Sequence, residues 1–110
     1  MTREQVIDRL RVWAARANSE ALEADTTAGR LNWAGQAQVL GDVAAFLANQ
    51  GAGLDLERVR LQVIGGRQQA IAAWELAREN ERELALHAGE VAGYDITLSL
   101  LRDLGSGWAA

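Results

Sequence analysis

The chain has 110 residues, of which 49% are apolar and 24% are charged, and its formal net charge is −4. This length suits a single domain with a modest core, and the composition differs from that of disordered chains. The negative charge argues against non-specific binding to nucleic acid or to anionic membranes. The N-terminus is polar, so we expect no secretory signal. No long apolar run is present, so we expect no membrane span.

Proline, cysteine and lysine are missing from the chain, so every basic residue is arginine. The absence of proline favours long uninterrupted helices. The absence of cysteine excludes disulfides, thiolate catalysis and zinc–thiolate sites, and it fits a cytoplasmic protein. The frequent alanine, arginine and glycine are typical of a GC-rich genome, so we expect a bacterial source.

The first part of the chain predicts a helical hairpin. Thr2 and Gln5 form a capping-box pattern at its start, and Thr26 or Thr27 can cap its second helix. Apolar residues recur every three or four positions in both helices, which are predicted over about residues 3–24 and 28–49. These apolar stripes are Val6, Leu10, Trp13, Ala17 and Ala21, and then Trp33, Ala37, Leu40, Ala44 and Leu47.

The second part of the chain predicts another hairpin. Asp55 is a good cap for its first helix, and the helical pattern continues to Leu86, which gives roughly 30 residues or about 45 Å. Gly65-Gly66 interrupts this pattern and marks a kink, a break or a tight crossing. The last helix is expected from near Gly89 to Leu104. The apolar stripes are Val59, Val63, Ala70, Trp74 and Ala77, and then Val91, Tyr94, Leu98, Leu101 and Leu104.

The expected fold is therefore all-α, a single domain over residues 1–110. Two tandem hairpins, at about 3–49 and 55–104, form an antiparallel four-helix bundle with a long third helix. A flexible tail, residues 105–110, follows the bundle. Its Trp108 either folds back on the bundle or docks on a partner.

The shift along the sequence that takes Leu22 to Leu76 places the first hairpin on the second, and we call this shift the common offset. It also aligns Ala34-Gly35 with Ala88-Gly89 and Leu47 with Leu101. Few other residues are identical at this shift, so either a duplication or a shared helical composition accounts for the matches.

The most suggestive chemical pattern is a run of residues four positions apart near the end of the predicted third helix, Glu75, Glu79, Glu83 and His87, with Glu90 three residues later. Some helical bundles hold metal with Glu and His side chains that share a face. A metal-dependent enzyme that uses this whole run is therefore one alternative function, with Glu79, Glu83 and His87 as the candidate metal ligands. Because arginines are interleaved and the chain has a single histidine, a solvated face with ion pairs is the favoured interpretation. We assign no catalytic residue and no cofactor, and we predict no enzyme activity.

The predicted first helix carries several arginines, which gives a second alternative, a nucleic-acid-associated adaptor that contacts phosphate groups. Acidic residues are interleaved with them and no helix-turn-helix pattern is present, so surface ion pairing is favoured. The arginines are Arg3, Arg9, Arg11 and Arg16.

The remaining features favour a small structural or interaction protein that acts by self-association or by binding a protein partner. The predicted second helix has a broad apolar arc and many small residues, which let a partner helix approach closely. We expect a homodimer with a helix-on-helix interface, and tryptophan is a frequent anchor of such interfaces. The predicted interface residues are Ala37, Gly41, Ala44, Ala45, Ala48 and Trp74.

Overall fold

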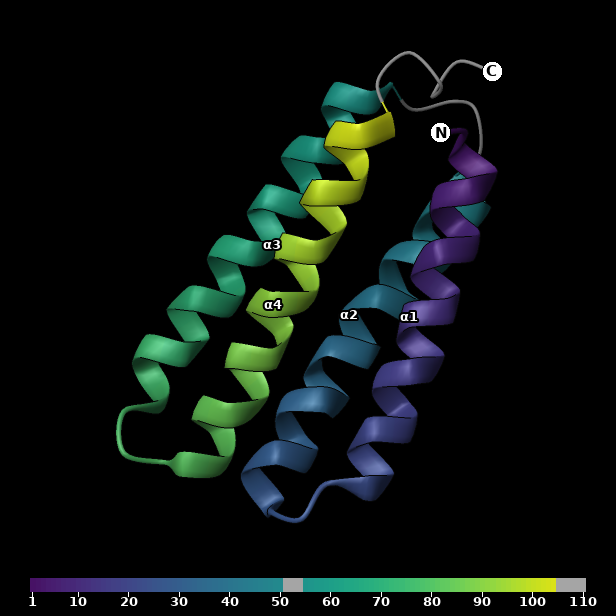
Figure 1. Ribbon diagram of the computed structural model, residues 1–110. Coiled ribbons are helices and arrows are strands. Elements are labelled where there is room, and N and C mark those ends of the chain that lie inside the picture. Colours follow the sequence, from purple (N-terminus) through teal and green to yellow (C-terminus); the bar gives the residue numbers. More distant parts are fainter. Residues whose placement is uncertain (51–54, 105–110) are drawn as a thin grey trace.

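The computed structural model describes residues 1–50 and 55–104, which form four α-helices and no strand. Figure 1 shows these helices as two hairpins. Their bounds are Arg3–Glu23 for α1, Thr27–Gln50 for α2, Leu56–Ala77 for α3 and Glu81–Leu104 for α4. The prediction of an all-α bundle of two tandem hairpins is confirmed. The predicted tail with Trp108 lies outside the described residues. None of these four helices is both long and apolar enough to cross a bilayer.

Polar side chains stand at the helix starts, where the first backbone N–H groups lack partners within the helix. Thr2 Oγ1 accepts a hydrogen bond from the backbone N of Gln5 at 3.2 Å, and Gln5 Oε1 accepts one from the backbone N of Thr2 at 2.8 Å. This confirms the predicted capping box. Of the two candidates for α2, Thr26 is the residue that caps it, since its Oγ1 accepts from Gly29 N. Asp55 caps α3, as predicted.

The third helix is shorter than predicted. It ends at Ala77 instead of continuing to Leu86, and α4 begins at Glu81 instead of near Gly89. Within its 22 residues, α3 runs through Gly65-Gly66 as a continuous helix.

A tight turn separates α3 from α4. Arg78 has a positive φ of 52°, and the backbone N of Asn80 donates to the carbonyl oxygen of Ala77 at 3.0 Å. Asn80 Oδ1 then accepts from the backbone N of Glu83 at 3.1 Å, which caps α4. The predicted long helix was wrong because Asn80, which caps α4, is surrounded in the sequence by residues that favour helices, so the pattern gave no sign of a turn.

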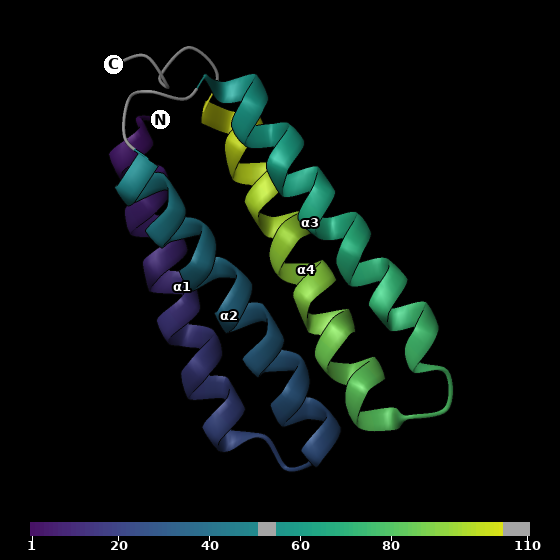
Figure 2. The same ribbon diagram turned by 180° about the vertical axis from the view of Figure 1, so that it is seen from behind.

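The two hairpins contact each other mainly through their second helices. α2 packs against α1 and α4, α4 packs against α2 and α3, and α1 touches α4 only lightly. Both hairpin turns lie at the same end of the molecule, so α2 and α4 run parallel, with α1 and α3 flanking them (Figures 1 and 2). Each outer helix therefore covers one inner helix and leaves much of its own surface uncovered.

The hairpins repeat at the common offset that the sequence suggested. α2 and α4 have 24 residues each, and they begin at positions 27 and 81. Their caps repeat as well, because Asn80 accepts from Glu83 where Thr26 accepts from Gly29. The ends of α2 and α4 and the hydrogen bonds that cap them therefore follow the common offset, whereas the start of α3 lies one residue earlier than this offset from the start of α1 would place it.

Glycines bring the backbones of α2 and α4 into contact. A Cβ atom on Gly35 would collide with the carbonyl oxygen of Leu86, and a Cβ atom on Gly89 would collide with the carbonyl oxygen of Asn32. The two contacts are related by the common offset. The inner helices therefore meet about an approximate two-fold axis that passes between Gly35 and Gly89.

The buried face of α4 continues this contact. A Cβ atom on Gly93 would lie 2.9 Å from Cβ of Val39, its counterpart at the common offset, so one of these two sites must lack a side chain. Thr97 follows on the same face, fully buried, and its hydroxyl donates to the carbonyl oxygen of Gly93 at 2.9 Å. Part of the stripe predicted for this helix is only half-buried, namely Val91, Tyr94 and Leu98.

The large apolar core lies at the end opposite the hairpin turns, where all four helices contribute. Each fully buried Leu or Val there stabilises the fold by about 1.5–3 kcal/mol relative to an exposed position. Toward the turns, the buried residues of the outer helices are alanines, so the glycine contact of α2 and α4 is the centre of that half. The most buried core residues are Val6, Leu10, Leu40, Val59 and Leu101.

Candidate functional site

The predicted run of carboxylates does not form one helix face. Glu75 lies on the last turn of α3, Glu79 lies in the turn, and Glu83 and His87 lie on α4. The three glutamates are exposed, whereas His87 is half-buried. The expected shared face was wrong because the helix ends at Ala77. In residues 1–50 and 55–104, no three His, Asp or Glu side chains gather in a way that could hold a metal ion.

Two of the predicted interface residues belong to the chain's own core. Ala37 and Ala44 are 5% and 1% exposed, because α1 and α4 cover α2 on these sides. Gly41 is half-buried, and Ala45 and Ala48 are exposed. A role in a homodimer stays a prediction for this set.

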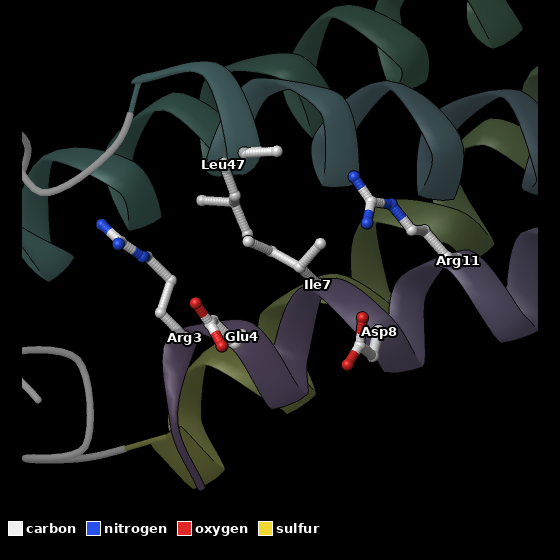
Figure 3. A pocket seen from close by; sticks show the side chains of 7 residues that line it. Arg3, Glu4, Ile7, Asp8, Arg11 and Leu47 are labelled. Carbon is white, nitrogen blue, oxygen red and sulfur yellow. The ribbon is translucent and has the colours of Figure 1, made fainter.

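The arginines of α1 lie among acidic side chains. A pocket of about 260 Å³ lies between the start of α1 and the end of α2. Ile7 and Leu47 point toward each other in it (Figure 3). Arg9 and Arg16 lie outside this pocket and are exposed. Because the pocket combines both signs of charge, it presents no concentrated positive surface to phosphate groups. Its charged lining residues are Arg3, Glu4, Asp8 and Arg11.

An exposed, uncharged face runs along α3, opposite the residues that this helix buries. Its residues recur every three or four positions and therefore share one side of the helix. Leu61 and Leu76 are 58% and 76% exposed. A Cβ atom on Gly65 would meet nothing within 4 Å. We call this surface the α3 outer face and define it as Leu61, Gly65, Gln68, Ala72 and Leu76.

Charge is scarce on this part of α3. Between Arg60 and Glu75 the sequence has one charged residue, Arg67. Its Nε donates to Asp95 Oδ1 on α4 at 2.6 Å, so this charge is directed toward the neighbouring helix. Trp74, the predicted anchor, is 44% exposed but lies about 160° around the helix from Leu76, away from the outer face.

The corresponding outer helix of the first hairpin is different. α1 carries charges along its whole length, and most of them are exposed. Its exposed large apolar residues, Val12 and Leu22, stand among these charges. The charged residues of α1 are Arg3, Glu4, Asp8, Arg9, Arg11, Arg16, Glu20 and Glu23.

A second feature is a groove of about 150 Å³ between α3 and α4. The His87 Nδ1 is in contact with Glu90 Oε1, and the two side chains are 23% and 26% exposed. Burial raises the pKa of Tyr94 above its ordinary value of 10, and the negative charges of Glu90 and Asp42 raise it further. The groove is lined by residues that include Gly66, Gln69 and Ala73 from α3, and His87, Glu90 and Tyr94 from α4.

Sequence reasoning noticed the pair of His87 and Glu90 but placed Tyr94 in an apolar stripe. The spacing of these three residues, i, i+3 and i+7, puts them on one side of a helix. That spacing could have identified the cluster, but only with α4 extended back to include His87.

By its fold, the described part of the chain belongs to the class of all-α helical bundles. Comparisons with protein-family models, with curated proteins and with solved structures found no match to this chain.

Proposed function

We propose that this protein is a helical interaction module that pairs with a second copy of itself through the α3 outer face. The observation that supports this proposal is the exposure of Leu61 and Leu76 at the two ends of an uncharged helix face. Single exposed apolar residues are common on protein surfaces, and what distinguishes this face from α1 is the absence of charged residues between its two leucines.

The order of residues along this face suits a two-fold antiparallel contact. If two copies of α3 cross between Gln68 and the next residue, Leu61 of each copy lies opposite Leu76 of the other. In the same register Gly65 lies opposite Ala72, so the small residues meet near the centre, where the helices are closest. Self-complementarity of this kind is what a two-fold interface requires.

The charges at the ends of the face favour the same orientation. At the start of α3, Arg60 pairs with Glu57 of the same helix at 3.7 Å, and Arg58 lies beside this pair. Glu75 lies at the end of α3, so an antiparallel pair would bring Arg58 of one copy toward Glu75 of the other. A parallel pair would place like charges together, which is unfavourable.

The expected affinity is weak. Four leucines covered in the dimer contribute about 2 kcal/mol each, and association costs at least about 4 kcal/mol in lost translational and rotational freedom. With smaller contributions from the flanking residues, we expect a dissociation constant on the order of 100 µM.

Sedimentation velocity from about 10 µM to about 1 mM tests the proposal. We expect the wild-type protein to shift from monomer to dimer over this range, and Leu61→Glu or Leu76→Glu to weaken the dimer at least tenfold, roughly 1.4 kcal/mol or more. Both substitutions are on exposed positions, so the fold should persist.

The first hairpin supplies matched controls. Val12 is 58% exposed, as is Leu61, and Leu22, at 85%, is the counterpart of Leu76 at the common offset. Val12→Glu and Leu22→Glu should leave the monomer–dimer equilibrium unchanged. A wild-type protein that stays monomeric at every concentration, or controls that act as strongly as the α3 variants, would contradict the proposal.

A further inference from the structure

The groove between α3 and α4 differs from the α3 outer face in position and in chemistry. It lies on the side of α3 that meets α4, and its volume of about 150 Å³ is roughly five times the share of one liquid water. Gly66 forms part of its wall, and a Cβ atom there would lie 2.7 Å from the Tyr94 ring. The glycine therefore allows the tyrosine to lie against α3.

The polar lining of this groove offers several hydrogen-bond acceptors. When His87 donates its Nδ1 proton to Glu90, its Nε2 keeps a free lone pair. The carboxylate of Glu90 has further lone pairs, and the Gln69 side chain carries an amide oxygen. The lining contains no arginine. A ligand with several N–H donors matches this arrangement.

The electrostatic potential in the groove also favours a positively charged ligand. Glu90 and Asp42 both raise the pKa of the Tyr94 hydroxyl, which indicates a negative environment at this atom. The aromatic ring of Tyr94 offers a further attraction, because the face of an aromatic ring attracts cations. A cation is therefore favoured over an anion or a neutral group.

The first hairpin has no such chemistry at the corresponding positions. At the common offset, His87, Glu90 and Tyr94 correspond to Trp33, Gln36 and Leu40. The Leu40 side chain is 1% exposed and belongs to the core. The helical framework thus does not require titratable groups at these positions, and their presence in the second hairpin calls for another reason.

We infer that the groove bounded by Gly66, Gln69, His87, Glu90 and Tyr94 binds a small primary ammonium group, carried either by a free amine or by a lysine side chain of another protein. The ammonium group has three N–H donors and one positive charge. Glu90 balances the charge, His87 Nε2 and the Gln69 oxygen accept hydrogen bonds, and the ring of Tyr94 covers the attached methylene groups.

Nuclear magnetic resonance tests this site directly, because His87 and Tyr94 are the single histidine and the single tyrosine of the chain. The uniformly labelled full chain is titrated with propylammonium chloride, and in parallel with sodium chloride at equal ionic strength. We expect saturable shifts of the His87 imidazole and Tyr94 ring signals with a dissociation constant of about 1–10 mM. Nα-acetyl-lysine methylamide, titrated in the same way, reports whether a lysine side chain also binds.

Three variants and one further cation make the test specific. Glu90→Gln should weaken binding about tenfold, since it removes the charge but keeps the shape. Glu20→Gln removes an exposed carboxylate from α1, away from the groove, and should leave the affinity within about twofold. Ala73→Leu should block the groove, and it provides a second measurement if Glu90→Gln lowers the thermal stability. Tetramethylammonium, which has no N–H donor, should bind at least about tenfold more weakly than propylammonium.

The inference is overturned if propylammonium and sodium produce the same linear shifts, or if Glu90→Gln and Glu20→Gln have equal effects. Equal binding of tetramethylammonium would also overturn it. If propylammonium alone saturates the site, the ligand is a free amine, and if the lysine derivative also saturates it, a protein side chain fits as well. These outcomes do not depend on whether the protein dimerises through the α3 outer face.

Discussion

The two hairpins share one framework but differ on their outer helices. Their inner helices, α2 and α4, have equal lengths, equivalent caps and reciprocal glycine contacts at Gly35 and Gly89. Their outer helices differ, since α1 is charged throughout while α3 has an uncharged outer face and borders the groove of His87 and Glu90. The inner pair therefore determines the architecture, and the outer helices leave room for different surfaces.

The difference follows from how tightly each region is constrained. At the glycine contact, the backbone of one helix occupies the place where a side chain of the other would stand, so only glycine fits. On an outer helix, the side that faces solvent contacts nothing, and almost any residue is compatible with the fold. Differences between the two hairpins are therefore expected on the solvent side of α1 and α3, and the groove adds His87, Glu90 and Tyr94 of α4.

The largest effect should come from breaking the shared framework. We expect Gly89→Ala to lower the free energy of unfolding by about 3 kcal/mol, because the added methyl group meets the rigid backbone at Asn32. Gly35→Ala should cost a similar amount, since it is the counterpart at the common offset. Thermal and urea denaturation followed by circular dichroism measure both values.

Gly41→Ala is the matched control on α2. A Cβ atom on Gly41 would meet nothing within 4 Å, so the substitution should raise stability by about 0.5–1 kcal/mol through helix propensity alone. Equal and small effects of all three substitutions would mean that α2 and α4 do not approach as closely as described.

A smaller effect on the free energy of unfolding should distinguish the turn of the second hairpin from that of the first. Arg78 has φ 52° and ψ −108°, a conformation that favours glycine, whereas its counterpart Ala24 has φ −67°. We expect Arg78→Gly to raise the free energy of unfolding by about 1 kcal/mol, which raises the melting temperature by roughly 4–8 °C.

Ala24→Gly should instead lower stability by up to about 1 kcal/mol, because glycine adds conformational freedom to the unfolded chain without relieving strain. Calorimetry of the two variants beside the wild-type protein provides the comparison. A loss of stability in both would show that the Arg78 side chain contributes more than its backbone costs.

The smallest effect concerns pH, and it distinguishes Tyr94 from its counterpart Leu40. The folded state raises the pKa of Tyr94 above 10, so the unfolded chain loses this proton first as the pH rises. Stability should therefore be fully present below about pH 10 and fall as the pH increases above it, until the folded protein also ionises.

Because the chain has neither lysine nor cysteine, few other groups titrate in this alkaline range. Urea denaturation between about pH 9 and 11 measures the dependence. Tyr94→Phe should remove it while keeping the ring in the groove. A slope that persists in Tyr94→Phe would assign the effect to other groups.

Much of the fold could be predicted from local patterns. The caps at Thr2 and Asp55, the start of the second helix, and four of the buried positions of α1 follow from spacing and residue type, since they depend on neighbours within one helical turn. The predicted stripe of α1 missed Ile7 and Ala14, which are buried, and included Trp13, which is only half-buried. The turn after Ala77 could not be predicted, because the residues around it are as favourable in a helix as in a turn. Its consequence was that Glu75 and His87 were placed on one helix.

The candidate surfaces were less accessible to sequence reasoning. Small residues on the predicted second helix suggested an intermolecular contact, yet Ala37 and Ala44 pack within the chain itself. A small residue permits close approach, but it does not specify which helix approaches. Gly89 and Gly93 were missed as buried positions for the same reason, since glycine carries no apolar side chain that a periodicity can detect.

The sequence by itself determined that the chain is helical, that it divides into two hairpins, and that most of the apolar stripe of α1 faces inward, because these properties depend on interactions a few residues apart. Only the tertiary structure decided that α2 and α4 form the centre, that the third helix stops at Ala77, and that α3 presents an uncharged face to solvent. These properties depend on which surfaces meet across the fold. Such long-range choices are made by steric fit at positions such as Gly35 and Gly89, whose partners lie in the other hairpin, far away along the chain.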